Sequence, residues 1–174
     1  MEEVDFEKQL KLGQAGEDKV FNYLNNLEST IDVIKFTEHH RFQSYGIDGL
    51  LVEDVGEAPP YSFTSFDVKT DYQHHRSGKL FIEIMADTNM NKKGGILSTK
   101  AAVFYYYDPY GGHLFKLPIY SIKMWYDRVG ISMNHVKRIN QHGQTTTGIL
   151  ISPDDLDSEG IQITRDNIGP IQYA

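Results

Sequence analysis

Apolar residues recur at three- and four-residue steps near the start of the chain, between Phe6 and Leu27. Charged and polar residues fill most positions between them, so the pattern predicts an amphipathic helix. Gly13 and Gly16 lie inside this stretch, and each costs roughly 1 kcal/mol relative to alanine in a helix interior. The helix is therefore expected either to begin after Gly13 or to pack closely against a neighbour at these glycines.

Short runs of β-branched and aromatic residues follow this helix and predict a series of strands. The clearest runs cover residues 31–36, 47–52, 63–70, 79–85, 101–107 and 148–152. Residues 113–117 are expected to return as the hairpin partner of the 101–107 strand, because a glycine-rich turn separates the two. Pro118 opens a second expected helix that reaches Val129, and residues 89–95 are expected to form a polar loop.

The alternation of helical and strand patterns predicts an α/β fold with a central mixed sheet. The strands near residues 31, 47, 63, 80 and 101 are expected to form this sheet, with the N-terminal helix covering one face. The 174 residues suffice for one domain with a core and are too few for two ordinary domains. We expect a single domain over residues 1–174, with its core in about residues 6–130 and a C-terminal extension over 131–174.

The composition excludes several classes of chemistry. The chain contains no cysteine, so disulfides, thiolate metal sites and thiol nucleophiles are ruled out. It also lacks the glycine loop of nucleotide hydrolases, the zinc-protease helix motif and the serine-hydrolase elbow. Its first residues are acidic, and no apolar run approaches the ~20 residues that span a bilayer. We expect a soluble, cytoplasmic protein with no membrane partner.

Asp48 and Asp67 are the first candidates for chemistry. Asp48 lies at the start of one expected strand and Asp67 lies on the next, so a hairpin can bring their carboxylates together. Lys69 follows Asp67 by two positions and is therefore expected on the same strand face. Phosphodiester hydrolysis needs oxygen ligands for Mg²⁺ or Mn²⁺ and a positive charge near the phosphate, and these residues supply both. An exposed strand with alternating charges would give the same pattern, so that alternative stays open.

Three motifs follow one another along the chain on the elements that would present them. They are Gly13-x-x-x-Glu17 on the helix, Gly46-Ile-Asp48-Gly, and Phe66-Asp67-Val-Lys69. This succession resembles the PD-(D/E)xK nuclease superfamily, in particular restriction-endonuclease-like and Holliday-junction-resolvase-like members of phage or bacterial type. The resemblance spans roughly residues 13–107 and implies a restriction-endonuclease-like fold, a central mixed β-sheet flanked by helices. It implies a metal-dependent nuclease that hydrolyses DNA phosphodiester bonds in recombination, repair or restriction.

The resemblance also implies roles for four catalytic residues. Asp48, Asp67 and Glu17 would hold a Mg²⁺ or Mn²⁺ ion, with Glu17 binding it directly or through water. Lys69 would assist the attacking water or the transition state. DNA is the expected partner. The form of the nucleic acid, cleavage from ends or within strands, and a homodimeric assembly are left open.

A strand with an Ile-Glu-Ile centre and a glycine-rich loop follow the lysine in relatives of this kind, and Glu83 and residues 94–95 match them. Glu83 is a candidate for a further ligand or for a hydrogen-bond acceptor behind the metal, although an exposed strand glutamate would look the same. Two positions depart from the pattern. Ile47 stands where proline precedes the aspartate, and isoleucine and leucine at 96–97 replace the aromatic residue after the loop.

The formal net charge of −7 is the opposite of the basic surface expected of a protein that binds phosphates. Carboxylates of a metal site contribute to this charge and a bound cation reverses it locally, so local basic patches are required. Lys92, Lys93 and Lys100 bracket the glycine-rich loop and are candidate DNA contacts. Lysines in a loop are more often only solvated.

Three aromatic and basic clusters have less specific patterns. Residues 39–41 and 74–76 each read His-His-Arg, and they either border the substrate cleft or are solvated loop residues. Neither histidine pair has metal-ligand spacing with a partner. The three tyrosines at 105–107 offer rings for base stacking, although tyrosines on a central strand more often pack in the core.

Two other functions fit the same residues. One is a catalytically inactive nuclease-fold protein that acts as a nucleic-acid-binding, protein-binding or inhibitory module, with an acidic surface that mimics DNA. The other is a structural subunit in which Asp67 and Lys69 form only a surface ion pair, worth ~0–1 kcal/mol. Thermal stabilisation by Mn²⁺ discriminates between them and a nuclease, because only an assembled carboxylate site binds the ion.

Overall fold

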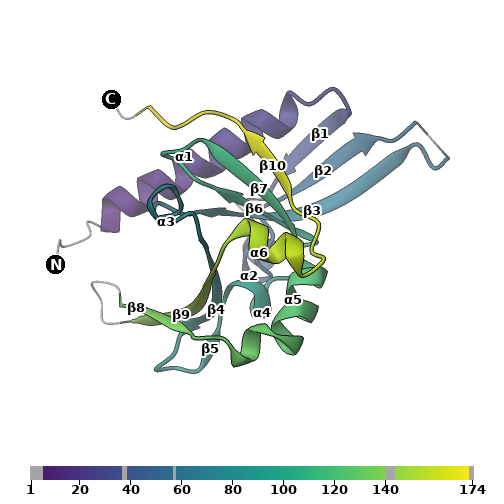
Figure 1. Ribbon diagram of the computed structural model, residues 1–174. Coiled ribbons are helices and arrows are strands. Elements are labelled where there is room, and N and C mark those ends of the chain that lie inside the picture. Colours follow the sequence, from purple (N-terminus) through teal and green to yellow (C-terminus); the bar gives the residue numbers. More distant parts are fainter. Residues whose placement is uncertain (1–5, 37–38, 57, 140–143, 173–174) are drawn as a thin grey trace.

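The computed structural model describes residues 6–36, 39–56, 58–139 and 144–172, and its strands form two sheets. The strands of the larger sheet are β1 (Thr30–Lys35), β2 (Gly49–Asp54), β3 (Tyr61–Thr70), β6 (Val103–Tyr107), β7 (His113–Pro118) and β10 (Thr164–Asn167). Those of the smaller sheet are β4 (Leu80–Asp87), β5 (Lys92–Lys93), β8 (Val136–Ile139) and β9 (Thr145–Ile151). Figure 1 shows the strand orders β1-β2-β3-β6-β7-β10 and β5-β4-β9-β8.

The larger sheet is mixed, because β3 and β6 run parallel while its other neighbouring strands run antiparallel. The helices are α1 (Phe6–Asn25), α2 (His40–Ser44), α3 (His74–Ser77), α4 (Gly95–Ser98), α5 (Ile119–Arg128) and α6 (Pro153–Ser158), with a 3₁₀ turn at Gly130–Ser132. The predicted α/β class with a mixed sheet and flanking helices is therefore confirmed. None of the described helices is both long enough and apolar enough to cross a membrane.

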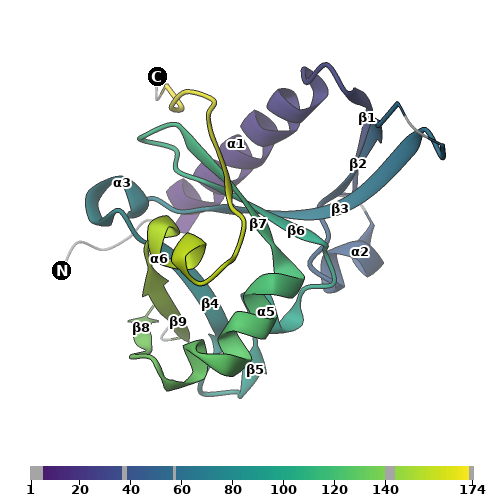
Figure 2. The same cartoon turned by 45° about the vertical axis from the view of Figure 1, so that its right-hand side comes forward.

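The N-terminal helix α1 runs through both of its glycines, so it does not begin after Gly13. The reason for the second glycine is close packing, because a Cβ atom added to Gly16 would lie 2.2 Å from Thr70 Oγ1 of β3. Val20 and Leu24 of α1 are buried in one hydrophobic cluster with Phe66 of the sheet. α1 thus covers one face of the larger sheet, as the sequence predicts, and Figure 2 shows it there.

A second hydrophobic core fills the space between the two sheets. Leu80 and Ile82 of β4 are buried in one cluster with Phe104 of β6 and with Ile122 and Trp125 of α5. The smaller sheet and α5 therefore cover the face of the larger sheet that is opposite α1. Alternation along β6 divides the two cores, since Tyr105 belongs to the cluster under α1 while Phe104 and Tyr106 belong to the other cluster.

The strand near residue 80 was expected in the central sheet, and this expectation is wrong. β3 already has β2 and β6 on its two edges, so β4 cannot pair beside it. β4 instead pairs with β9, from Leu80 opposite Ile151 to Met85 opposite Thr147. The predicted polar loop after β4 contains the short strand β5, which returns along its other edge.

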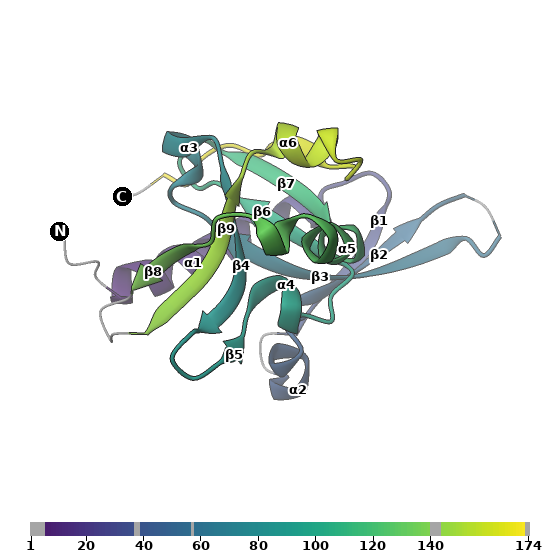
Figure 3. The same cartoon turned by 60° about the horizontal axis from the view of Figure 1, so that its bottom comes forward.

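Residues after 130 do not lie outside the core. They supply β8 and β9 to the smaller sheet and β10 to the edge of the larger sheet. Ile149, Ile151, Leu156 and Ile161 are among the buried core residues. The core therefore extends well beyond residue 130, because short apolar runs separated by polar residues still form complete strands when a partner strand is present. Figure 3 shows the β2–β3 hairpin extending away from this body of the molecule.

Candidate functional site

The β2–β3 hairpin places Asp48 directly beside the middle of β3. Gly49, the first residue of β2, is opposite Phe66 in the antiparallel register, so Asp48 is the residue immediately before β2. The Asp48 N–H donates to Phe66 O at 2.9 Å, and the Asp48 carboxylate Oδ2 accepts from the Val68 N–H at 2.7 Å. The Asp48 carboxylate thus takes the place of a backbone carbonyl as the acceptor of the Val68 N–H. This hydrogen bond fixes the carboxylate at the edge of β3.

Asp67 and Lys69 lie on the β3 face that is turned away from α1, as alternation along the strand requires. Asp67 is 2% exposed, and its Oδ1 atom lies 2.7 Å from Lys69 Nζ. The Lys69 side chain is 43% exposed, and its ammonium lies 5.8 Å from the centre of the Phe104 ring. The buried carboxylate is therefore reached from solvent along the lysine side of the site.

The electrostatics of Asp67 are unusual for a carboxylate. Burial raises the pKa of Asp67 to about 7, the positive charge of Lys69 opposes this rise, and the Asp48 carboxyl group adds to it by charge and hydrogen bonding. The Lys69 ammonium is the partner of Asp67 Oδ1, and this buried oxygen has no other partner within the described residues. Two neighbouring carboxyl groups, one of them buried and paired with a lysine, form a site of negative charge that a cation would stabilise.

Glu17 approaches the same site from the middle of α1. Burial raises the pKa of Glu17 and the negative charge of Asp48 raises it further, while Lys35 and Lys69 act in the opposite direction. The close contact of Gly16 with Thr70 accounts for this position, because it brings the helix backbone against β3 one residue after Lys69. The structure therefore brings Glu17, Asp48, Asp67 and Lys69 into one electrostatic group.

Glu83 faces Lys69 from the smaller sheet. For Lys69, burial favours a lower pKa, but the charges of Asp67, Asp48 and Glu83 outweigh it and raise the pKa. The glycine pair after β5 is required at this point, since a Cβ atom on Gly94 would lie 2.3 Å from Glu83 Oε1. Lys69 thus lies between the aspartate pair on one sheet and a glutamate on the other.

The donor set fits a divalent cation only in part. Carboxylate oxygens are the ligands that Mg²⁺ and Mn²⁺ prefer, and Asp48 and Asp67 supply two carboxyl groups that interact with each other. Within the described ranges, however, no group of three or more acidic or histidine side chains is arranged to hold a metal ion. The charge of Asp48 raises the pKa of Glu17, which was expected as a third ligand, but Glu17 does not complete such a group among the described residues.

The three lysines expected to contact DNA occupy two separate places. Lys92 and Lys93 form the exposed strand β5, opposite Asp87 and Met85 of β4. Lys100 follows α4 and is exposed, and its N–H donates to Tyr45 O at 2.7 Å. These positions do not test whether the three lysines contact nucleic acid, so that role stays a prediction.

A fourth lysine near the site was missed by sequence reasoning. Lys123 of α5 donates from Nζ to Thr99 O at 2.8 Å, next to Lys100. Thr99 itself is 1% exposed, and its hydroxyl donates to Gly46 O at 2.7 Å, two residues before Asp48. No spacing in the sequence indicates this contact, because it depends on how α5 packs against α4.

The two His-His-Arg clusters have different environments. Residues 39–41 enter the short helix α2 and are exposed, and the next residue, Phe42, accepts the Ile47 N–H through its carbonyl at 3.0 Å. α2 therefore borders the segment that carries Asp48. His74, in contrast, is buried, and its Nδ1 lies 3.2 Å from Oδ2 of the buried Asp108. The expectation of a solvated loop is wrong for His74, because α3 folds this ring against Phe115.

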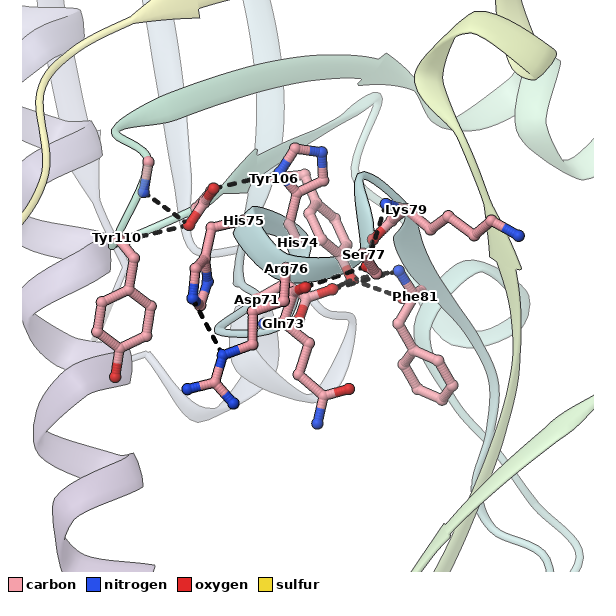
Figure 4. A network of polar contacts seen from close by, with 12 residues as sticks. Asp71, Gln73, His74, His75, Arg76, Ser77, Lys79, Phe81, Tyr106 and Tyr110 are labelled. Atoms are coloured by element: carbon pink, nitrogen blue, oxygen red, sulfur yellow. Dashed lines mark hydrogen bonds and ion pairs between the residues drawn. The ribbon is translucent and has the colours of Figure 1, made fainter.

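Polar contacts at the end of β3 tie the two sheets together (Figure 4). The Tyr106 hydroxyl lies 2.6 Å from Phe81 O and 3.2 Å from Asp71 Oδ2, and Asp71 Oδ2 also accepts from the Phe81 N–H at 3.3 Å. Tyr105, Tyr106 and their neighbour Tyr107 are all buried, so the prediction of core packing is confirmed and base stacking is excluded for them. The network fixes the start of β4 against β3 and so positions Glu83 relative to Lys69.

Comparisons of the chain with models of protein families, with curated proteins and with solved structures gave no match.

Proposed function

We propose that this protein is a Mg²⁺- or Mn²⁺-dependent nuclease that hydrolyses DNA phosphodiester bonds, and that its site is formed by Asp48, Asp67, Lys69 and Glu17. One observation carries the proposal. The Asp67 carboxyl group is buried, its Oδ1 lies 2.7 Å from the Lys69 ammonium, and the Asp48 carboxyl group is near enough to raise its pKa. Adjacent carboxylates with a neighbouring lysine supply cation ligands and a positive charge together, as metal-assisted phosphodiester hydrolysis requires.

The position of each residue suggests a separate role in the proposed reaction. Asp48 and Asp67 would hold the cation, and the hydrogen bond from the Val68 N–H to Asp48 Oδ2 would fix the Asp48 carboxylate for this role. A bound Mg²⁺ or Mn²⁺ would stabilise charge on phosphate oxygens and lower the pKa of an attacking water. Lys69, whose side chain is partly exposed, would supply its positive charge to a phosphate group. Glu17, whose pKa is raised by burial and by Asp48, would accept a hydrogen bond or a proton from water beside Asp48.

The test is a cleavage assay with the purified protein on linear, circular and branched DNA, and on RNA of the same sequence. Each substrate is incubated with Mg²⁺, with Mn²⁺ and with a chelator. We expect cleavage of DNA that depends on the metal and is lost in Asp67→Asn and in Lys69→Ala. Circular DNA separates cleavage within strands from cleavage at ends, because it offers no end.

Matched controls exclude a general effect of losing charge. Asp127 and Lys137 are exposed and lie on α5 and β8, outside the proposed site. Asp127→Asn and Lys137→Ala should therefore cleave DNA like the unaltered protein. Metal-dependent cleavage that persists in Asp67→Asn would assign the reaction to another site or to a contaminant, and would refute the proposal.

One observation favours a second candidate, a nuclease-fold protein that binds a partner without turnover. The described residues assemble no three-ligand metal group, and Lys69 occupies the position beside Asp67 that a cation would take. Mn²⁺ distinguishes the two functions, since a metal that binds only the folded state raises the melting temperature. A nuclease site should give a rise that Asp67→Asn reduces, whereas the binding module should give none.

A further inference from the structure

A short loop beside the candidate site is held in a fixed position relative to the aspartates. Thr99 in this loop is buried, donates from its hydroxyl to Gly46 O at 2.7 Å, and accepts from the Ala101 N–H at 3.1 Å. The fit around Gly46 is tight, because an added Cβ atom would lie 3.1 Å from Thr99 Oγ1 and 3.2 Å from Asp67 Oδ2. Thr99 of the loop and the buried carboxylate of Asp67 therefore both lie next to Gly46.

Two lysines lie at this loop. Lys123 of α5 donates to Thr99 O at 2.8 Å, and Lys100 is the next residue of the loop, held by its N–H to Tyr45 O at 2.7 Å. Burial lowers the pKa of Lys123, and the positive charge of Lys100 lowers it further. In the described part of the chain, neither lysine has a carboxylate at ion-pair distance, whereas Lys35 and Lys69 each have one.

Two like charges in proximity oppose each other, and an anion between or beside them removes that cost. A chain with a net charge of −7 gains nothing for solubility from such a pair. One of the ammonium groups is also fixed to a backbone carbonyl, which reduces the side-chain entropy lost when it binds a ligand. The arrangement therefore favours an anion as its partner over simple solvation.

The position of Lys100 and Lys123 near the aspartates indicates which anion they would bind. A nucleic-acid strand carries one negative charge per about 3.4 Å of its axis, so a strand held at the aspartates presents further phosphates on either side of the bond held there. We infer that Lys100 and Lys123 form a phosphate subsite that binds the nucleic-acid backbone next to the bond held at Asp48 and Asp67. This inference rests on the proposed nuclease function and adds Lys123 as a residue that positions the substrate.

The experiment measures binding apart from cleavage. A fluorescently labelled DNA duplex is titrated with the protein in Ca²⁺ at several salt concentrations, and a gel verifies that the duplex stays intact. Each lost phosphate contact should reduce the slope of log K against log salt by about 1. Lys100→Ala and Lys123→Met should each show this loss, and the double variant should lose about 2. Lys123→Arg should retain the slope, because it keeps the charge.

The control variant Lys137→Ala removes an exposed lysine on β8 and should leave the slope unchanged. Thermal melting verifies that each variant is folded, and if Lys123→Met unfolds, the exposed Lys100→Ala and the charge-keeping Lys123→Arg still decide the question. An unaltered slope in Lys100→Ala, in a protein that binds and cleaves DNA, overturns the subsite and leaves the nuclease function intact. Failure of the unaltered protein to bind or cleave any nucleic acid overturns both.

Discussion

Lys69 Nζ lies 2.7 Å from Asp67 Oδ1, so the ammonium stands where a cation bound to that carboxylate would stand. The lysine and a divalent ion therefore compete for the same oxygen. This competition gives the two residues of the Asp-x-Lys motif opposite effects on metal binding, although both are needed for the proposed cleavage.

Lys69→Ala should abolish cleavage while metal binding is retained or strengthened. The substitution removes no ligand, and it removes a positive charge that repels the ion and occupies its place. Calorimetric titration with Mn²⁺, run beside the cleavage assay, measures both quantities. Weaker Mn²⁺ binding in Lys69→Ala, with Lys137→Ala unaffected, would show that the lysine supports the metal site instead of competing with it.

Metal affinity should depend steeply on pH below neutrality. Burial raises the pKa of Asp67 to about 7, so at lower pH the ion must displace a proton from this carboxyl group. The apparent affinity for Mn²⁺ should rise about tenfold per pH unit from pH 5 to about 7 and then level off. Titrations in two buffers of different ionisation enthalpy count the released proton. A flat affinity over that range would mean that Asp67 is not a ligand.

The metal-free protein should lose stability as pH rises through the same range. The pKa of Asp67 is raised by burial from 3.8 to about 7, so between these values the folded state binds a proton that the unfolded state has released. The free energy of unfolding should therefore fall by up to ~4 kcal/mol from pH 4 to 7 through this group, and remain lower above pH 7. Urea unfolding at several pH values in chelator measures the change.

Asp67→Asn should remove that pH-dependent loss and make the metal-free protein more stable at pH 8 than the unaltered chain. The reason is that asparagine buries no charge at any pH, while keeping the shape of the side chain. Asp127→Asn, on the exposed side of α5, serves as the control and should change the profile little. Parallel profiles for the Asp67→Asn variant and the unaltered chain would contradict the assignment of the buried charge to Asp67.

The parts of the site that follow from local patterns could be predicted from the sequence. Period-two alternation puts Asp67 and Lys69 on one strand face whatever the rest of the chain does. The hairpin between the two aspartates brings Asp48 alongside, and helical periodicity places Glu17 on α1. The mixed sheet follows from the order of elements, and the restriction-endonuclease-like identity of the fold stays a prediction.

The parts that depend on distant packing could not be predicted. β4 pairs with β9, which lies about 65 residues later in the chain. No local sequence pattern indicates which other strand an apolar segment will pair with. Lys123 reaches Thr99 only because α5 packs near the loop, and His74 is buried only because α3 turns it towards Asp108. Helix α2 has five residues, which is too short for a periodic pattern to reveal it.

Two glycines in α1 provide a matched pair that tests how the helix places Glu17. A Cβ atom on Gly13 would meet nothing within 4 Å, whereas one on Gly16 would lie 2.2 Å from Thr70 Oγ1. Gly13→Ala should stabilise the protein by roughly 0.5–1 kcal/mol, because alanine favours the helix and nothing must move. Gly16→Ala gains the same helix preference, yet it forces α1 away from β3 and should destabilise the protein by roughly 1–3 kcal/mol.

The displacement in Gly16→Ala should also move Glu17 from the aspartates, so cleavage should fall more than in Gly13→Ala at a temperature where both variants are folded. Thr70→Ala makes room for the new methyl group, since it removes the two Thr70 atoms nearest to it, Oγ1 and Cγ2. The double variant should therefore recover stability and part of the cleavage, which a double-mutant cycle measures as a favourable coupling. Additive losses, with no recovery when Thr70 is truncated, would mean that the contact between α1 and β3 does not position the glutamate.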